Sequence, residues 1–373
     1  VHGFGVWGYA GVLACARLRA AAPGCEAIPI VSSYTTYEAE SRGILDSQAG
    51  YGLRTRLRHR ADHLWIRLAV NRWERRAYGE ARRVLINYES VRRLIAASHG
   101  AAVGGACVKL TYAAEAAFLR EAGPGAGQER DAAPAPGAGQ VRDAAPAPGA
   151  GQEPDAAPRR GEEGGAPLIV AVARHEPRKG GDVLLAALDR LRAAGVPFRA
   201  CLVGGGRQLA EERALARGLG LAGQVEQPGE VPDSFPYLER ADLFVLASRS
   251  EQSGSLALLE ALQAGCAVVA SRVDGIPEDV DDGASALLVE PGDPRALAAT
   301  LARLLGDPPL RRRLAAAARR RFEERFSAGA FAAALGKVYA ELGVVPEARS
   351  GGGDGTGTGG GAEALAVQTP AEA

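Results

Sequence analysis

The segment 243-LFVLASRSEQSGSLALLEALQAGCAVVAS-271 decides the fold of this chain. Its apolar runs 243–247 and 266–270 have the length and composition of buried strands. Between them lie a polar loop, 248–254, and a helix, 255–264, which Gly265 ends. The order strand, loop, helix, strand predicts a parallel sheet. The loop falls at the carboxyl end of its strand, where open α/β sheets bind their ligands.

Two glutamates stand in this segment, Glu251 in the loop and Glu260 in the helix. Glu260 lies among leucines, and a buried carboxylate there would need a partner. A lone glutamate would be read as a surface residue of an amphipathic helix, but the second carboxylate favours a functional pair. The free N–H groups of the helix that begins at Ser255 suit an anionic or hydroxyl-rich ligand.

With these residues the segment resembles the donor-sugar loop of the retaining, nucleotide-sugar-dependent glycosyltransferases of the GT-B fold, in particular the family 4 type. The resemblance implies that Glu251 is the catalytic residue beside the donor sugar and that Glu260 binds the ribose hydroxyls. It also implies that loop amides contact the sugar hydroxyls, here those of Ser253, Gly254, Ser255 and Leu256. The chain departs from the family in having eight residues rather than seven between the glutamates, with Gln252 in place of the usual glycine.

A second cluster of candidate residues follows the apolar run 168–173. In 174-RHEPRKGG-181, Arg174 and Lys179 have the spacing of the family's phosphate-binding pair. Their charges can neutralise a departing nucleoside diphosphate, although two basic loop residues alone are usually just solvated. Gly204 and Gly205 end the strand 198–203, where a glycine run either lets the backbone approach a nucleotide or makes a plain turn. Val231, in the loop 228–236, lies where the family reads the base.

The resemblance implies a hexosyltransferase-type enzyme that moves a sugar from a nucleotide sugar to a glycan, lipid or small-molecule acceptor with retention of configuration. No cofactor and no metal are expected, since the chain has no Asp-x-Asp motif where one would serve. A nucleotide-sugar-binding protein without turnover and a GT-B-like sugar-nucleotide epimerase or phosphorylase are the alternatives. The residues name neither the sugar, the base nor the acceptor.

The pattern of elements predicts an α/β protein of the GT-B class, with two Rossmann-like domains facing a cleft. Residues 1–122 read as an incomplete N-terminal, acceptor-side domain, and residues 167–343 as the donor-binding domain. Between them, 123–166 carries a Pro, Ala and Gly-rich repeat of twelve residues that is too polar to fold, so a disordered linker is expected. A disordered tail, 344–373, is expected at the other end.

The N-terminal half shows weaker signals. A strand is expected at 27–34 and a long helix at 53–78. Residues 83–95 read as a strand followed by a helix, and 107–119 as the last strand of the domain with its exit segment. Ser90 is the predicted N-cap of the next helix. The chain contains no methionine and opens at what resembles a late strand of the family's first domain, which favours an N-terminally truncated product. The family often has a histidine after the next strand, but no catalytic histidine is carried over because Ser32 and its neighbours stand there.

Composition excludes some classes of function. The formal net charge is zero and the basic residues are scattered, so nucleic acid is not an expected partner. The five cysteines form no metal-ligand or disulfide pattern, and Cys201 and Cys266 are expected as small buried residues. A reducing, cytoplasmic setting fits. No apolar run has the length of a membrane span. The Arg-rich region 54–83 is most simply a solvated helix face, with peripheral contact at the inner face of a membrane as the alternative.

Overall fold

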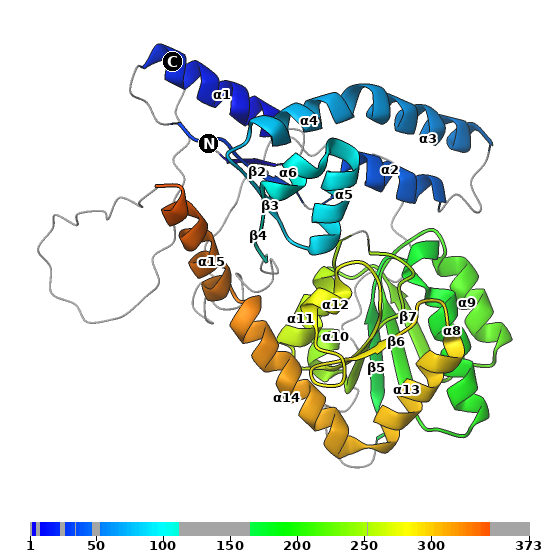
Figure 1. Cartoon of the computed structure of the whole chain (residues 1–373). Coiled ribbons are helices and arrows are strands. Elements are labelled where there is room, and N and C mark those ends of the chain that lie inside the picture. The colour runs from blue at the N-terminus through cyan, green and yellow to red at the C-terminus, as the bar shows by residue number, and fades with distance from the viewer. Residues whose placement is uncertain are drawn as a thin grey trace, which may run out of the picture. The chain divides into compact units, whose positions relative to one another are not determined.

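A computed structural model describes residues 2–4, 8–22, 27–33, 35–46, 53–111, 165–251 and 253–343 (Figure 1). Residues 123–164 of the expected linker, the tail 344–373 and Gln252 lie outside the described residues. Contacts divide the chain into two compact units, Val1–Leu335 and Gly336–Ala373, and both sheets belong to the first. Both sheets are parallel and alternate with helices, which confirms the predicted α/β class.

The first sheet has four parallel strands in the order β1-β2-β3-β4. Its strands are β1 (His2–Phe4), β2 (Ile30–Ser33), β3 (Arg83–Ile86) and β4 (Cys107–Lys109). Its helices are α1 (Gly8–Ala21), α2 (Tyr37–Asp46), α3 (Leu53–Trp65), a π-helix (Ile66–Val70), α4 (Asn71–Glu80), α5 (Glu89–His99) and α6 (Ala101–Gly105). The predicted long helix is thus α3, the π-helix and α4 in succession, whereas α2 and α6 were not predicted.

The predicted N-cap at Ser90 is wrong. Helix α5 begins at Glu89 after Tyr88, with no side-chain cap from its own segment, and the Ser90 hydroxyl has no hydrogen-bond partner. The carboxylate of Glu278, far away in the sequence, instead accepts hydrogen bonds from the backbone N–H groups of Glu89 and Ser90 at 3.0 and 3.3 Å. A negative charge at a helix N-terminus satisfies these donors better than a neutral hydroxyl, because it also meets the positive end of the helix dipole.

The second sheet has six parallel strands in the order β10-β9-β8-β5-β6-β7. They are β5 (Leu168–Val172), β6 (Arg199–Val203), β7 (Val225–Gly229), β8 (Leu243–Leu246), β9 (Ala267–Ser271) and β10 (Leu287–Val289). Strand β5 pairs with β6 on one side and β8 on the other, so the strand order reverses there. The crevice at the carboxyl ends of β5 and β8 is therefore the topological switch point, where such sheets bind ligands.

The helices of this sheet follow the expected alternation. They are α8 (Gly181–Ala193), α9 (Leu209–Gly218), α10 (Phe235–Arg240), α11 (Leu256–Gln263), α12 (Ile276–Asp279), α13 (Pro294–Gly306), α14 (Pro308–Arg325) and α15 (Ala328–Glu341). The predicted strand–loop–helix–strand unit is confirmed as β8, α11 and β9. The predicted loop 228–236 is partly wrong, because its first two residues finish β7 and Phe235 begins α10. There the Asp233 carboxylate accepts the Phe235 N–H at 2.9 Å and starts the helix.

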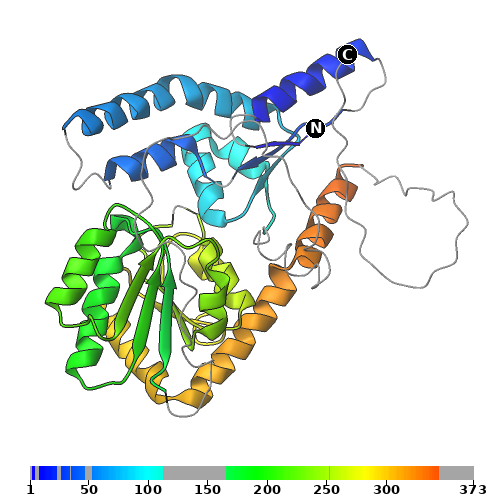
Figure 2. The same cartoon turned by 180° about the vertical axis from the view of Figure 1, so that it is seen from behind.

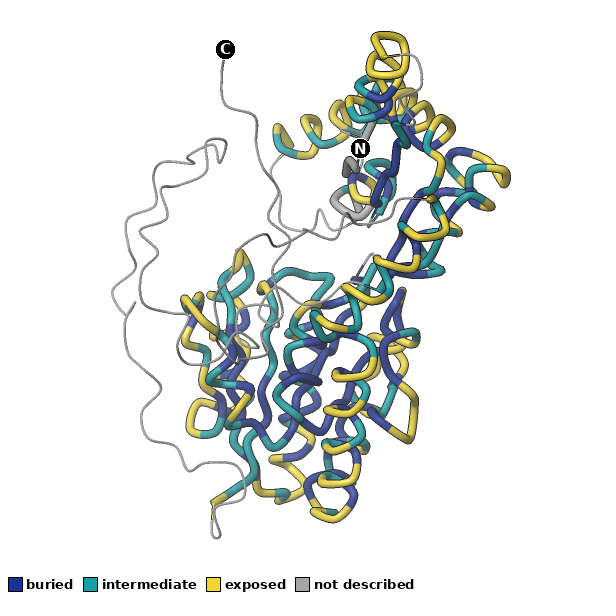
Figure 3. The backbone as a smooth tube through the Cα atoms, turned by 90° about the vertical axis from the view of Figure 1, so that its left-hand side faces the viewer, coloured by how far each residue is buried: buried dark blue, intermediate teal, exposed yellow. Residues whose placement is uncertain are grey.

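The core of the six-stranded sheet lies on both of its faces. Alternate residues of a strand enter different clusters, as Leu243 and Val245 enter one and Phe244 and Leu246 the other. Helices α8, α9 and α13 cover the first cluster, and α10, α11 and the later part of α14 cover the second (Figures 1 and 2). Strands β6, β8 and β9 are buried along almost their whole length, and Figure 3 shows buried tube in the middle of this part of the molecule. A parallel sheet covered on both faces holds its strand ends firmly in place, which positions the loops that follow.

Candidate active site

A cavity of about 730 Å³ opens at the carboxyl edge of the six-stranded sheet. Its walls come from the loops after β5, β6 and β7 and from the β8–α11 loop with the first turns of α11. Apart from Ser253, every predicted site residue lines it: Arg174, Lys179, Gly204, Gly205, Val231, Glu251, Gly254, Ser255, Leu256 and Glu260. Residues from four separate loops therefore meet in one cavity at the switch point. Ser253 lies close by, and its carbonyl accepts the Gly275 N–H at 2.6 Å.

The loop after β5 reaches across the end of β8. It passes through a 3₁₀ turn, Pro177–Lys179, and then Gly180 adopts φ +69°. A Cβ on Gly180 would stand 2.1 Å from the carbonyl oxygen of Ala247, so only glycine fits this approach. The turn points Lys179 toward Glu251, while the Arg174 guanidinium stays exposed and pairs with Glu176 at 3.0 Å.

Lys179 and Glu251 form a buried ion pair. The ammonium nitrogen donates to both carboxylate oxygens of Glu251 at 2.8 and 2.6 Å, and the Ser248 hydroxyl donates to the same carboxylate. The side chain of Glu251 is 2% exposed and that of Lys179 is 14% exposed. A buried carboxylate is costly unless it is paired and hydrogen-bonded, and Lys179 and Ser248 provide these contacts. The two residues that the sequence assigned to sugar and phosphate thus lie in direct contact.

The backbone around Glu251 is held by a residue to which the sequence assigned no chemistry. The Asp274 carboxylate accepts the Glu251 N–H at 2.6 Å and the Ser250 hydroxyl at 3.0 Å. Asp274 has φ +45°, a left-handed conformation that aspartate tolerates better than most residues. The loop after β9 therefore supports the loop after β8.

Helix α11 presents its N-terminus and Glu260 to the cavity. Ser255 is the N-cap, and its hydroxyl accepts the Leu258 N–H at 3.4 Å. The Leu256 side chain is half exposed. Glu260 lies one turn further, half-buried, with the Ser234 hydroxyl 3.5 Å from its carboxylate. Of the two possibilities for Glu260, a solvated helix face or a ligand-facing position, the structure shows a carboxylate that lines the cavity.

The glycine run after β6 is dictated by close packing. Gly204 has φ +141°, and a Cβ there would stand 2.0 Å from the Ala173 carbonyl oxygen. The backbone can therefore follow the β5 loop only with glycine at this position. The carboxylate of Glu230, from the neighbouring loop, lies against Gly205. The cavity is also lined by residues that were not predicted as site residues: Val172, Ala173, Arg178, Val203, Gly206, Glu230, Pro232, Ser234 and Ala257. Glu230 is adjacent in sequence to Val231, and Arg178 is adjacent to Lys179. Adjacency to a predicted site residue is the feature of the sequence that could have indicated them.

Two further sequence expectations concern metals and cysteines. Among the described residues there is no group of three or more His, Cys, Asp or Glu side chains that could hold a metal ion. Cys201 and Cys266 are buried, as expected, and neither forms a disulfide. Burial raises the pKa of the Cys201 thiol to about 12, so it stays protonated and unreactive. None of the helices that the structure describes is long and apolar enough to cross a membrane.

Comparison with known proteins relates this chain to the glycosyltransferases. Residues 153–321 match the family of glycosyl transferases group 1. The lipopolysaccharide core biosynthesis glycosyltransferase LpsE of Rhizobium meliloti is 34% identical over 150 residues, which are 40% of this chain and 43% of that protein. The GDP-mannose-dependent α-(1-6)-phosphatidylinositol monomannoside mannosyltransferase of Mycolicibacterium smegmatis is 34% identical over 153 residues, 39% of this chain and 40% of that protein. The matches span less than half the length of these relatives.

Solved structures extend the likeness to both sheets. Sucrose-phosphate synthase from Thermosynechococcus elongatus superposes with a TM-score of 0.58 at 21% identity, over 91% of this chain and 73% of that chain. Anabaena HepE in complex with UDP gives a TM-score of 0.54 at 15% identity, over 92% and 99% of the two chains. The fold is that of the GT-B glycosyltransferases. Residues 153–321 match the group 1 glycosyltransferase domain, and the resemblance to the family 4 type is confirmed.

Proposed function

We propose that the protein transfers a hexose from a nucleotide-sugar donor to an acceptor, with retention of the anomeric configuration. One observation carries this proposal: Arg174, Lys179, Glu251 and Glu260, from two loops and a helix, line a single cavity of about 730 Å³ at the switch point. The cavity has the size of a site for a ligand of nucleotide-sugar dimensions. Two basic side chains and two carboxylates around one cavity match a ligand with a diphosphate and two sugar rings.

In the proposed reaction the basic residues stabilise the departing nucleoside diphosphate. An ammonium group has three donors, and Lys179 uses its contacts to Glu251 for two of them, so one remains for a phosphate oxygen. The exposed guanidinium of Arg174 is free to swing from Glu176 to the phosphates. The N-terminus of α11 adds a positive partial charge. These groups place positive charge where negative charge develops in the transition state, and we propose that no metal ion is required.

Glu251 has an orienting and electrostatic role in this proposal. Its carboxylate accepts hydrogen bonds from Lys179 and Ser248, and these contacts hold it in place and lower its nucleophilicity. A fixed negative charge beside the anomeric carbon stabilises the oxocarbenium-like transition state. Glu260 is assigned to the ribose hydroxyls and the loop amides at Gly254 and Ser255 to the sugar. Val231 is assigned to the neighbourhood of the base.

The relatives support the classes of donor and acceptor. One relative is named for lipopolysaccharide core biosynthesis, one uses GDP-mannose and acts on a phosphatidylinositol mannoside, and a structural neighbour was solved with UDP. We therefore expect a nucleoside diphosphate sugar as donor and a glycan or a lipid-linked sugar as acceptor. A binding protein without turnover is the second candidate, favoured by the extra loop residue and by Gln252.

We also propose peripheral contact with a membrane surface through α3, the π-helix and α4. This segment exposes Leu53, Leu57, Leu64, Trp65, Leu68 and Trp73. The same segment carries many arginines, so apolar insertion and attraction to anionic lipids would act together. Such contact would bring a lipid-linked acceptor to the protein.

The test of the donor site is calorimetric titration of the full chain with UDP-, GDP- and ADP-sugars. One donor is expected to bind, and Glu260→Ala is expected to weaken it about tenfold or more, since a carboxylate accepting from a hydroxyl pair contributes about 1.5–3 kcal/mol. Glu239→Ala, an exposed glutamate of α10 outside the cavity, is the matched control. Absence of binding by a folded wild type would refute the donor site. Binding without transfer or donor hydrolysis would favour the second candidate, and the product's anomeric configuration by NMR tests retention.

A further inference from the structure

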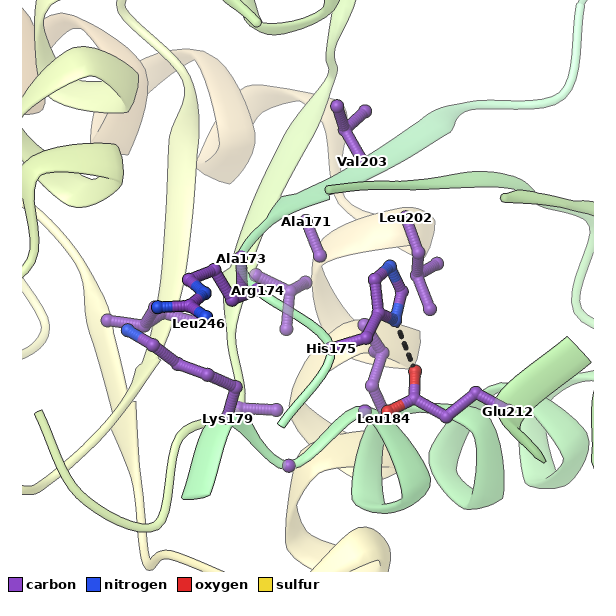
Figure 4. Close-up of a pocket in the computed structure, with 14 residues that line it drawn as sticks. Ala171, Ala173, Arg174, His175, Lys179, Leu184, Leu202, Val203, Glu212 and Leu246 are labelled. Atoms are coloured by element: carbon purple, nitrogen blue, oxygen red, sulfur yellow. Dashed lines mark hydrogen bonds and ion pairs between the residues drawn. The ribbon is translucent and has the colours of Figure 1, made fainter. Parts of the chain in front are cut away.

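Beneath the β5 loop, on the side away from the donor cavity, lies a buried pair of side chains that the proposed reaction does not use. The Nδ1 atom of His175 stands 2.6 Å from a carboxylate oxygen of Glu212 (Figure 4). His175 is 6% exposed and Glu212 is 4% exposed. His175 directly follows Arg174, and Glu212 projects from α9, the helix after the glycine run. The pair therefore joins the phosphate-side loop to the element that follows β6.

Backbone hydrogen bonds run parallel to this contact. The His175 N–H donates to the Gly205 carbonyl at 2.8 Å, and the Gln208 N–H donates to the His175 carbonyl at 3.0 Å. The β5 loop and the glycine run are thus tied together at His175 by two main-chain bonds and one side-chain bond. Their relative position decides how far Arg174 and Lys179 stand from Gly204 and Gly205 across the donor cavity.

Close packing gives this contact little freedom. A Cβ on Gly181 would stand 2.3 Å from the Glu212 carboxylate, and one on Gly206 would stand 2.5 Å from the His175 carbonyl oxygen. The carboxylate therefore lies against the first turn of α8, where the helix dipole favours a negative charge. Both flanking elements approach as closely as glycine allows, so displacement of either side chain would move the loop.

The small cavity around the pair, about 30 Å³, shares a wall with the donor cavity. Arg174 and Lys179 line both of them. The loop is thus a thin partition, with the buried pair on one side and the space for the diphosphate on the other. A change at the pair would be transmitted to the two basic residues through a few backbone atoms.

Stability alone does not account for the pair. Within the described residues, Nε2 of His175 and one carboxylate oxygen of Glu212 have no hydrogen-bond partner. A buried polar pair that is only partly satisfied generally contributes less to stability than apolar side chains of similar volume. The surroundings are apolar, with Leu184, Leu202 and Val245 close by, so an apolar pair would pack well there.

We infer that His175 and Glu212 are positioning residues that hold Arg174 and Lys179 at the correct distance from the diphosphate of the donor. The inference rests on the proposed function for the identity of the ligand. It separates two roles within one loop: Arg174 and Lys179 contact the phosphates, and the pair below them sets where the loop lies. The pair acts on the diphosphate half of the ligand and leaves the base and ribose contacts unchanged.

The first test needs no ligand. Hydrogen exchange of the full chain is compared for the wild type and for the double variant His175→Leu with Glu212→Leu, which replaces the pair by apolar side chains. The amides of His175, Lys179 and Gln208 are expected to exchange about tenfold faster or more, corresponding to the loss of about one hydrogen bond's stabilisation. Glu211→Gln, an exposed neighbour on α9, should change nothing. Unchanged exchange at these amides in the double variant would overturn the inference.

The second test separates positioning from general stability. Affinities for a nucleoside diphosphate and for the corresponding nucleoside are measured with each variant, together with the thermal unfolding midpoint. The double variant should unfold at or above the wild-type midpoint, bind the diphosphate about tenfold more weakly, and bind the nucleoside equally well. Glu212→Gln keeps an acceptor for Nδ1 and should restore most of the affinity.

Equal loss of affinity for the nucleoside diphosphate and for the nucleoside would show a merely structural role. If the wild type itself binds no nucleotide, the proposed function fails, whereas the exchange result still decides the positioning role.

Discussion

The four-stranded and the six-stranded sheets differ in what their helices leave exposed. Among the described residues around the six-stranded sheet, only Leu215 and Leu256 are exposed large hydrophobic residues, and Leu256 lines the cavity. The helices of the four-stranded sheet expose many more: Leu13, Leu18, Leu53, Leu57, Leu64, Trp65, Leu68 and Trp73. The first sheet's helices thus keep an apolar face without a partner in this chain's described residues. The helices of the six-stranded sheet bury most of their apolar side chains in the core, and this core holds the loops at the ends of the strands in place.

Both regions also bury a glutamate, and the comparison shows what marks a site. Glu74 is fully buried beside the four-stranded sheet, where it meets the Tyr78 hydroxyl at 3.2 Å and Nε2 of His99 at 3.1 Å. Burial and the nearby carboxylate raise the pKa of Tyr78 well above its usual range. Glu251 is similarly buried and paired but lines a cavity. Glu74 is therefore read as structural and Glu251 as a functional candidate, because only Glu251 of these two buried carboxylates lines a cavity.

The largest effect is expected at Gly180, where the loop after β5 packs against the end of β8. Gly180 and Gly195 both have φ +69°. A Cβ on Gly180 would lie 2.1 Å from the carbonyl oxygen of Ala247, whereas a Cβ on Gly195 would have no neighbour within 4 Å. Gly195→Ala should cost about 1–2 kcal/mol of unfolding free energy, for the left-handed backbone alone. Gly180→Ala adds a steric overlap and should cost up to about 5 kcal/mol. Denaturant unfolding of the two variants measures both. Equal costs would mean that the loop is not held against β8 as described.

A buried aspartate of the same region gives a smaller, pH-dependent effect. Burial raises the pKa of Asp279 from 3.8 to about 7, although the Tyr88 hydroxyl donates to it at 2.7 Å. The folded protein therefore keeps a proton that the unfolded chain releases above about pH 4, so stability falls as pH rises from about 4 to 7. Asp279→Asn should remove on the order of 3 kcal/mol of this fall.

Unfolding free energies at several pH values test this expectation. Asp62→Asn, at an exposed position of α3, serves as the control and should leave the pH profile unchanged. Parallel pH profiles for the wild type and Asp279→Asn would show that Asp279 does not hold its proton in the folded protein.

The smallest effect concerns the exposed face of the four-stranded region. Leu68→Ser should weaken binding to vesicles of phosphatidylglycerol and phosphatidylcholine about fivefold, since roughly 1 kcal/mol is lost with one partly inserted leucine. Leu215→Ser, on α9, is the matched control and should have no effect. Co-sedimentation with these vesicles and with pure phosphatidylcholine measures it. Equal binding by all variants, or none by the wild type, would leave the apolar face without a membrane role.

Much of the six-stranded region was predictable because its signals are local. Buried parallel strands are short apolar runs, and each is followed by a polar loop and a helix, so their order could be written down from 167 to 343. The domain boundaries themselves stay predictions. The local signals gave a wrong prediction where a residue distant in the sequence makes the contact. Ser90 was predicted to cap α5, but the helix N-terminus is instead satisfied by Glu278, more than 180 residues away. Helix α2 was missed because its segment is short and largely polar.

For the site, sequence reasoning found most of the residues that line the cavity but not how they are held. Arg174, Lys179, Glu251 and Glu260 were recognised from their types and spacing. The supporting contacts were not, because they join separate loops: Asp274 to Glu251, and His175 to Glu212. Nothing in the order of residues marks such pairs, since each partner alone is a common surface residue type.

The sequence by itself determined the kind of protein: the periodicity of its apolar runs sets the sheet, and the residue types at the strand ends set the possible chemistry. The tertiary structure alone decided the geometry of the site. Parallel strands bring their carboxyl ends to one edge whatever their separation along the chain, so Lys179 meets Glu251 across 72 residues. Ion pairing, steric limits at glycine and burial depend on distances in space, and only packing creates those distances.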